Sequence, residues 1–435
     1  MGTLELPKLV NEIMARFKTC GYEIYVVGGV IRDFYLGKQP DDYDLVSNAS
    51  ISTILSLFPE YHNINENGQR HGTITFHTEI GNIEISSFHG NTLAEDLQYR
   101  DLNINAIAFD GKDFIDPRNG IQDIENHKLS MGEDPNKIIE DDPLRILRVL
   151  RFHAETSFEI APKTKSAICL NAQKLGRISK ERITSELRKI LLAPDIGSLL
   201  DEYRVIFGTL FPDLAATFDF DQHNPWHAHD LYTHTFYVVQ GTPARFRIRI
   251  AALFHDLGKV PCRSIEWKSK TEYVYHFYGH PASSASIAEP ILSEYRFGNQ
   301  EIAEILFLIT NHDNEIPLTP KAVKKVLAKI DTLHADPIPL LEDLLDLQIS
   351  DHLDHTTVTP IHKAETLALA KEILAQKEAF TIRQLTINGD DLLNLGFHGK
   401  EIGDVLKNVL NLVIEEELQN KREVLLNYAH SLKAN

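Results

Sequence analysis

Residues 25–46, YVVGGVIRDFYLGKQPDDYDLV, place a glycine pair and several charged residues directly behind an apolar run. Residues 23–27 predict a buried strand, Gly28 and Gly29 a tight turn, and the residues after them the first turns of a helix. In this order, the free N–H groups at the start of the helix can bind a phosphate, with Arg32 beside them. A glycine pair before a helix is more often a plain turn, so further evidence is needed.

That evidence comes from the end of the same stretch, where Asp42 and Asp44 are separated by one residue. Residues two apart in an extended segment share a face, so the two carboxylates are expected to point the same way. Carboxylates this close repel each other unless a cation lies between them, and their hard oxygen atoms suit Mg2+. A D-x-D alone indicates a solvated turn, but behind a phosphate-type turn it predicts a site for a nucleotide and a metal.

Composition limits the possible classes of protein. The length of 435 residues suggests about two to four domains. The net charge of −18 argues against broad binding of nucleic acid, but residues 144–192 hold 11 Lys and Arg against 4 Asp and Glu. This basic block predicts one directed polyanion site. Three scattered cysteines and the absence of an apolar run of ~20 residues predict a cytoplasmic protein without a membrane partner.

The opening stretch resembles the first motif of the polymerase-β nucleotidyltransferase superfamily, and specifically of class II tRNA nucleotidyltransferases and bacterial poly(A) polymerases. Similar later motifs follow in the family's order, at residues 95–110 (EDLQYRDLNINAIAFD), 116–124 (DPRNGIQDI), 140–152 (EDDPLRILRVLRF) and 181–192 (ERITSELRKILL). Tyr99, Leu102 and Asp141 depart from the usual Arg, Phe and Glu. The resemblance implies an α+β fold, with a polymerase-β-like nucleotidyltransferase head followed by an all-α neck, an HD domain and a helical tail.

The motif at residues 140–152 can also be interpreted without the family resemblance. Arg145, Arg148 and Arg151 recur at every third residue, with Asp142 ahead of them, and the residues between the arginines are mostly apolar. Such a helix is largely buried, and buried arginines need partners, for which a nucleotide with its triphosphate is suited. The alternative is a solvated basic stripe.

The resemblance assigns roles to individual residues. Asp42 and Asp44 are the catalytic pair that holds Mg2+, and Asp142 with Arg145 forms the protein template for CTP and ATP. Glu84 is either a third carboxylate near the metal or a structural, inward-facing residue. The other residues expected to bind the nucleotide are Gly28, Gly29, Arg32, Asp33, Arg100, Asp101, Asn105, Arg148 and Arg151.

A second chemistry is indicated in the middle of the chain. Histidine followed by aspartate, with spaced His and Asp residues on other helices, is typical of a metal centre. The pattern resembles an HD-type phosphohydrolase with Ni2+, Mn2+ or a similar divalent metal; the alternative is a degenerate scaffold kept for packing. The expected ligands are His234, His255, Asp256, His280, His312 and Asp351, whereas His223, His227 and His229 have no assigned role.

Four domains are therefore expected: a head at 1–128, a neck at 129–200, an HD domain at 201–370 and a tail that contacts tRNA at 371–435. The expected function is addition of CCA to the 3′-end of tRNA from CTP and ATP with release of pyrophosphate. Only ten residues, HGNTLAEDLQ, replace the longer flexible loop of CCA-adding members, so addition of CC alone is an alternative. Poly(A) polymerase and a hydrolase with a degenerate head are the others, and the oligomeric state is open.

Overall fold

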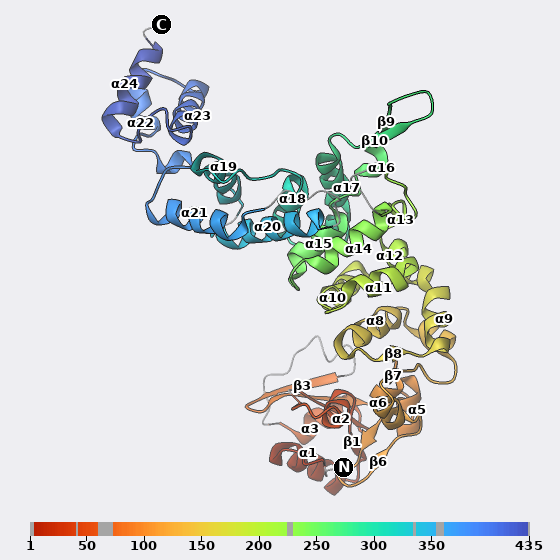
Figure 1. The fold of residues 1–435 in the computed structure, drawn as a ribbon. Helices are drawn as coiled ribbons and strands as arrows, with labels where there is room; N and C mark the ends of the chain where they lie inside the picture. Colours follow the sequence, from red (N-terminus) through yellow and green to blue (C-terminus); the bar gives the residue numbers. More distant parts are fainter. Residues whose placement is uncertain are drawn as a thin grey trace. The chain divides into compact units, whose positions relative to one another are not determined.

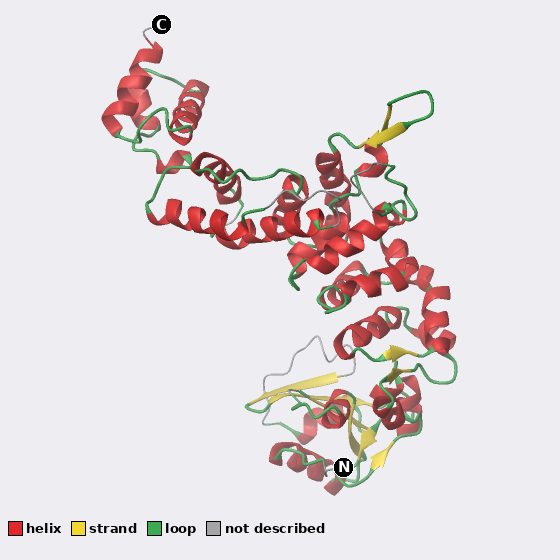
Figure 2. Cartoon of the chain, viewed as in Figure 1, coloured by secondary structure: helices red, strands yellow, loops and turns green. Residues whose placement is uncertain are grey.

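The computed structural model describes residues 4–40, 42–59, 73–223, 229–333, 336–353 and 361–433. The chain divides into two compact units, Met1–Ile190 and Leu191–Asn435 (Figure 1). A mixed sheet lies in the first unit, whereas helices dominate the second (Figure 2). The expected α+β class is confirmed. Among the described residues, no helix combines the length and apolarity that crossing a membrane requires.

Six strands of the first unit form a sheet in the order β3-β4-β2-β1-β5-β6, and β7 pairs with β8 in a separate two-stranded sheet. Neighbours in the six-stranded sheet are antiparallel except β2 and β4, which run parallel, so Asp44 on β2 lies opposite both Val27 on β1 and Glu84 on β4. Its strands are β1 Ile24–Val27, β2 Tyr43–Ser47, β3 Thr73–Thr78, β4 Gly81–Ser87, β5 Ala108–Phe109 and β6 Phe114–Ile115.

The glycine turn after β1 joins the sheet to α2, which begins at Gly29, one residue earlier than the sequence predicts. Gly28 adopts φ +71° and ψ −129°, a conformation that side chains other than hydrogen rarely allow. The helices around the sheet are α1 Lys8–Thr19, α2 Gly29–Tyr35, α3 Ile51–Leu57, α5 Leu93–Tyr99, α6 Gly120–Glu125 and the 3-10 turn η1 Asn103–Asn105.

Residues 140–152, which include the arginine repeat, do not form one continuous helix. The first part ends at Asp141, Asp142 is extended, and the second part begins at Arg145. Pro143 explains the break, because the residue before a proline is pushed out of the helical region. The remaining elements of this unit are β7 Lys128–Leu129, α7 Pro135–Asp141, α8 Arg145–Thr156, β8 Glu159–Ile160, α9 Pro162–Leu170, η2 Ala172–Arg177 and α10 Lys180–Ile190.

The second unit carries the expected HD residues on, or directly after, a set of packed helices. They are α11 Ile196–Glu202, α12 Arg204–Leu210, α13 Pro212–Ala215, α14 Leu231–Gly241, α15 Phe246–Phe254, α16 Lys259–Cys262, α17 His280–Glu294, α18 Asn299–Asn311, α19 Pro320–Asp331, α20 Ile338–His352 and α21 Lys363–Ala375. Among the described residues, the all-helical expectation misses an antiparallel hairpin of β9 Ser264–Trp267 and β10 Tyr273–His276, and in the expected neck it misses the short parallel pair of β7 and β8.

The tail has an apolar core of its own, which is centred on Leu392, Val409 and Leu425. All three side chains are fully buried. The elements that form this core are η3 Ile382–Gln384, α22 Gly389–Asn394, α23 Lys400–Ile414 and α24 Arg422–Lys433.

Candidate functional site

The glycine turn lies directly against one of the two predicted catalytic carboxylates. A Cβ atom on Gly28 would lie 3.2 Å from Oδ2 of Asp44 and 3.6 Å from Nη1 of Arg100. A Cβ atom on Gly29 would lie 3.5 Å from Nη2 of Arg32. The backbone therefore approaches a carboxylate and two guanidinium groups at the start of α2, where a phosphate can reach the free N–H groups.

Three carboxylates lie on, or directly before, the neighbouring strands β2 and β4. Asp44 is partly buried beside Glu84, and exposed Asp42 accepts a hydrogen bond from the backbone N–H of Asn82 at 3.0 Å. Burial raises the pKa of Asp44 to about 6, with further contributions from Glu84 and Asp42. A divalent cation relieves such repulsion, and carboxylate oxygens are the kind of ligand that Mg2+ prefers. Glu84 is exposed, which contradicts its reading as an inward structural residue.

A chain of hydrogen bonds connects α2, η1 and α8. Arg32 Nη1 donates to Asn105 Oδ1 at 3.0 Å, and Asn105 Nδ2 donates to Asp101 Oδ1 at 3.0 Å. Arg148 Nε donates to Asp101 Oδ2 at 2.5 Å. Burial alone would raise the pKa of Asp101, but Arg148 and Asn105 more than offset it, and the pKa falls to about 2. Asp101 is thus ionised and holds Arg148 in place.

Two further carboxylates orient arginines of the site. Asp33 Oδ1 accepts hydrogen bonds from Nε and Nη2 of Arg32, both at 3.2 Å. Asp96 is completely buried, and its Oδ2 accepts from Nε and Nη2 of Arg100 at 3.2 and 3.1 Å. Both pairs fix planar guanidinium groups, which suits the recognition of phosphate oxygens.

The predicted template residues, Asp142 and Arg145, both line the same cavity, but each already has partners within the protein. Arg145 donates from Nη1 to the carbonyl of Ile138 at 3.1 Å and from Nη2 to the carbonyl of Tyr99 at 2.6 Å. Asp142 Oδ2 accepts from Nη2 of Arg182 at 2.8 Å. A base that pairs with both residues has to displace or share these contacts.

Tyr99, which replaces the family's usual Arg, is central to this arrangement. Its ring lies 4.7 Å from the Arg145 guanidinium and stacks on the His89 ring with centroids 4.4 Å apart. Asp96 holds His89 by accepting from its backbone N–H at 3.0 Å. Because α5 occupies residues 93–99, most of the ten-residue connection is helix rather than loop.

Most of these groups line one cavity of about 550 Å³, a size suited to a small ligand. At one side, Arg151 lies over the Phe152 ring at 4.5 Å and 3.4 Å from Glu186 Oε2. The lining residues are Gly28, Gly29, Arg32, Asp44, His89, Tyr99, Arg100, Asp101, Asn105, Asp142, Leu144, Arg145, Arg148, Arg151, Phe152, Glu155, Arg182 and Lys189.

The cavity brings together most of the predicted nucleotide-binding residues. Asp33 and Asp42 are not among its lining residues, although Asp33 orients Arg32 and Asp42 lies beside Asp44. Sequence reasoning did not single out Arg182 or Lys189, which contribute positive charge from α10. Their signal was the local excess of Lys and Arg, which pointed to the segment but not to individual residues.

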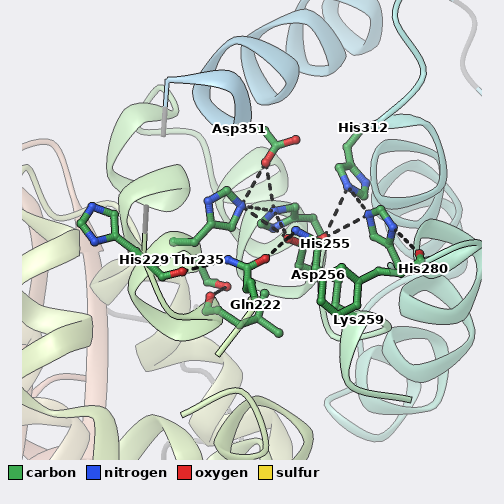
Figure 3. A network of polar contacts seen from close by, with 12 residues as sticks. Gln222, His229, Thr235, His255, Asp256, Lys259, His280, His312 and Asp351 are labelled. Atoms are coloured by element: carbon green, nitrogen blue, oxygen red, sulfur yellow. Dashed lines mark hydrogen bonds and ion pairs between the residues drawn. The ribbon is translucent and has the colours of Figure 1, made fainter. Parts of the chain in front are cut away.

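The six predicted HD residues converge in the second unit as two overlapping groups. His234, His255, Asp256 and Asp351 form one group, and Asp256 with His280 and His312 forms the other. In each group, one ligand atom per residue lies within 4.8 Å of the others. Figure 3 shows Asp256 between the two groups. The sequence pattern predicted the six residues, but it did not predict that Asp256 belongs to both groups.

The imidazole rings are oriented by backbone carbonyls. Nδ1 of His255 lies 2.7 Å from the carbonyl of Ala252, and Nδ1 of His312 lies 2.7 Å from that of Ile309. A carbonyl can only accept, so these Nδ1 atoms carry the protons and the Nε2 atoms are left as metal ligands. His280 is held in the same way, with its Nδ1 3.0 Å from a carbonyl oxygen.

The carboxylate of Asp256 provides a test of whether a metal fits. Within the described part of the chain, neither oxygen accepts a hydrogen bond of good geometry, although both are buried. Oδ2 lies 3.2 Å from Nε2 of His255 and 2.7 Å from Nζ of Lys259, and Oδ1 lies 3.2 Å from Nε2 of His280. Burial would raise the pKa of Asp256, but His255 and Lys259 hold it well below its usual range. An ionised, buried carboxylate among imidazole nitrogens fits divalent cations.

Two of the three histidines without an assigned role, His223 and His229, are among the described residues. The backbone carbonyl of His229 accepts a hydrogen bond from Nε2 of Gln222 at 3.1 Å, and the His223 ring stacks on Tyr273. Figure 3 shows His229 beside the network. His227 lies outside the described residues.

Known protein families match three parts of the chain. The poly A polymerase head domain matches residues 24–93 and 88–130. The probable RNA and SrmB-binding site of polymerase A matches residues 157–218, and the HD domain matches residues 230–355. The chain thus combines a nucleotidyltransferase head, an RNA-binding segment and an HD domain, and the resemblance seen in the sequence is confirmed.

Curated proteins similar to the chain include tRNA nucleotidyltransferases. The CC-adding tRNA nucleotidyltransferase of Shouchella clausii is 40% identical over 172 residues, which are 39% of this chain and 45% of that protein. The CCA-adding enzyme of Lactobacillus helveticus is 25% identical over 448 residues, covering 97% of this chain and 96% of the relative. The match thus spans about half the length of the first relatives, and the whole length of a more distant one.

Solved structures share the fold over the whole chain. The Bacillus stearothermophilus CCA-adding enzyme in complex with CTP has a TM-score of 0.72 and 21% identity, covering 98% of this chain and 97% of that structure. The Thermotoga maritima CCA-adding enzyme complexed with tRNA has a TM-score of 0.56 and 20% identity, covering 98% and 96%. At these identities the likeness establishes the fold, and the activity has to be argued from the site.

Proposed function

We propose that the chain adds the CCA end to tRNA, using CTP and ATP and releasing pyrophosphate. One observation carries the proposal: a single cavity unites the glycine turn, the carboxylate of Asp44, and the template pair Asp142 and Arg145. The full-length similarity to a CCA-adding enzyme supports it.

Different residues of the cavity have different roles in nucleotidyl transfer. Gly28, Gly29 and Arg32 bind phosphate oxygens at the start of α2, and Arg148, held by Asp101, faces the same space. Asp42 and Asp44 would hold Mg2+, which would supply charge neutralisation for the triphosphate and a lower pKa for the RNA 3′-hydroxyl. The hydroxyl oxygen then displaces pyrophosphate from the α-phosphorus.

Base selection falls to Asp142 and Arg145, which offer an acceptor and a planar donor at the cavity wall. A good bidentate pair with a base edge discriminates by roughly 1–3 kcal/mol. Arg182, bonded to Asp142, keeps that carboxylate oriented and adds positive charge for the RNA or the triphosphate.

Addition of CC alone is a second candidate, because one observation favours it. Before α5 begins at Leu93, the connection after β4 has very few residues outside regular structure, and Tyr99 at the end of α5 holds Arg145. A change from C to A requires the pocket to re-form around a larger base, for which a mobile segment is the usual means. Two relatives, 40% identical over 172 residues and 36% identical over 181 residues, are CC-adding tRNA nucleotidyltransferases.

For the second unit we propose metal-dependent hydrolysis of phosphate esters, including 2′,3′-cyclic phosphates. Two overlapping ligand groups that share Asp256 support it, and a degenerate scaffold would not need to keep every ligand position filled. Ni2+, Mn2+ or a similar ion would be held by these residues and would supply an activated water. Lys259, 2.7 Å from Asp256, is placed to hold a phosphate oxygen.

Some expectations remain proposals. These are the division into four domains at residues 128, 200 and 370, the contact of the tail with tRNA, and a cytoplasmic location. Poly(A) polymerase shares the head motifs and is an alternative that sequencing of the RNA 3′-ends distinguishes.

Transfer of label from α-labelled CTP to a tRNA transcript that lacks its CCA end tests the proposal. The wild-type chain should label the transcript, and Asp42→Ala or Asp44→Asn should not, while tRNA binding measured by gel shift is retained. Lys112→Ala, which changes a charge on the exposed β5–β6 turn, is the matched control. Incorporation at the wild-type rate by either aspartate variant would refute the metal assignment.

A further inference from the structure

The β9–β10 hairpin interrupts the HD domain between two of its ligand residues. The chain leaves Asp256, passes α16, forms the hairpin and returns at His280. In Figure 1 the hairpin extends away from the neighbouring helices of its unit. All four residues of β9 are exposed, and all four of β10 are only partly buried.

One face of this hairpin is apolar and aromatic. Trp267 pairs with Tyr273 across the strands and Ile265 pairs with Tyr275, so these four side chains share a face. Ile265 is 56% exposed and Trp267 is 62% exposed. We call this set, Ile265, Trp267, Tyr273 and Tyr275, the aromatic face.

A guanidinium group and an imidazole ring lie beside the aromatic face. The Arg263 guanidinium lies 5.1 Å from the centroid of the Tyr275 ring, and the His223 ring stacks on Tyr273 at 4.3 Å. Glu266 lies on the opposite face, where it is paired with Lys268. Asp221, 3.6 Å from His223, stands at the edge.

The base of the hairpin contacts the metal-binding residues. The carbonyl of Phe277, the residue after β10, accepts from Nδ1 of His280 at 3.0 Å. The Phe277 ring lies 5.8 Å from Nζ of Lys259, which itself lies 2.7 Å from Asp256. A strand rises about 3.3 Å per residue, so Tyr275 lies about 7 Å along the strand from Phe277.

We propose that the aromatic face binds unpaired bases of an RNA chain and delivers its phosphate end to the HD centre. Aromatic rings on neighbouring strands, flanked by arginine, stack on bases of any sequence. The continuity with residues suited to a phosphate ester selects RNA over a protein partner. The inference deepens the hydrolase function proposed above, and it makes the substrate an RNA end rather than a free nucleotide.

The sequence offers a direct spectroscopic test, since it contains only two tryptophans, Trp226 and Trp267. In the full-length Trp226→Phe protein, Trp267 is the only tryptophan. Titration with unstructured oligouridylate should quench its fluorescence to saturation, because a stacked base quenches indole. Tyr273→Leu in the same background should weaken binding roughly ten-fold, the loss of about one stacked base. Val274→Ala, on the opposite face of the same strand, should bind as before.

A kinetic test separates this inference from the hydrolase function. With Mn2+ or Ni2+ added, Trp267→Ala should raise KM roughly ten-fold for an oligoribonucleotide that ends in a 2′,3′-cyclic phosphate. Hydrolysis of a cyclic mononucleotide should not change. Equal losses on both substrates would show a merely structural role and overturn the inference.

The remaining outcomes are also decisive. If neither ester is hydrolysed, the proposed hydrolase function fails, while saturable quenching of Trp267 still supports RNA binding by the aromatic face. Absence of quenching would refute RNA binding by the aromatic face. Concentration-dependent self-association that Trp267→Ala abolishes, without any quenching by RNA, would assign the face to a second copy of the chain instead.

Discussion

Replacing Asp101 by Asn is expected to destabilise the first unit. Asp101 is buried and accepts hydrogen bonds from the N–H of Leu102 at 2.8 Å, from Asn105 at 3.0 Å and from Arg148 at 2.5 Å. An amide can keep the first two bonds through its oxygen. Its NH2 group then faces the Arg148 guanidinium, so that two donors meet in a buried place.

The magnitude follows from the pKa of this carboxyl group, which falls from 3.8 to about 2. Each pH unit corresponds to about 1.36 kcal/mol, so the charged form contributes about 2 kcal/mol to the free energy of unfolding. Because the folded-state pKa is the lower one, this contribution is complete above about pH 4 and is lost as the pH falls through about 2. About half of it remains at pH 3.

Pulse-labelling hydrogen exchange read by mass spectrometry measures this in the intact chain. Wild type and Asp101→Asn are equilibrated in a urea series at pH 7 or pH 3, and then labelled at one common pH. Peptides from residues 97–109 report on the first unit, and peptides from the second unit serve as the internal control. A loss below about 0.5 kcal/mol at pH 7, or an equal loss at both pH values, would refute the reasoning.

Three further outcomes are expected. Tyr99→Ala removes a cation–π contact worth about 0.5–1 kcal/mol, so steady-state kinetics should show a two- to five-fold higher KM for CTP and weaker preference for CTP over ATP; unchanged kinetics would exclude this role for the ring. Gly28→Ala forces a side chain into φ +71° against Asp44, and should lower incorporation at least ten-fold and stability by about 1–3 kcal/mol in urea unfolding. Asp256→Ala should abolish ester hydrolysis and bound divalent metal, measured by elemental analysis, with wild-type incorporation of CTP; a parallel loss of both activities would contradict separate sites.

The sequence was sufficient to predict site residues where a short motif indicates both a local structure and a chemical function. The six HD residues could be named before the fold was known, because their order along the chain resembles the HD family and the adjacent His255 and Asp256 are typical of a metal centre. The D-x-D pair could be placed after a glycine turn for the same reason. The HD residues are buried, so their cost of burial requires a partner, whereas Asp42 is exposed and Asp44 is only partly buried.

The missing parts depend on packing between distant segments. Register between β2 and β4 places Glu84 beside Asp44, and no local pattern encodes that pairing. The stacking of Tyr99 between His89 and Arg145 likewise depends on how α5 packs. In contrast, the helix break at Asp142 was readable from Pro143, and the alternation of residues 264–267 and 273–276 was a signal for the hairpin.

Sequencing of RNA 3′-ends tests the proposed head activity most directly. A tRNA transcript that ends in the discriminator base is incubated to completion with excess CTP and ATP, supplied separately and together. With both nucleotides, the proposed function predicts ends that read CCA, and with CTP alone, ends that stop after CC. Uniform CC ends in the presence of both nucleotides would establish the second candidate, and long runs of A would contradict both in favour of a poly(A) polymerase.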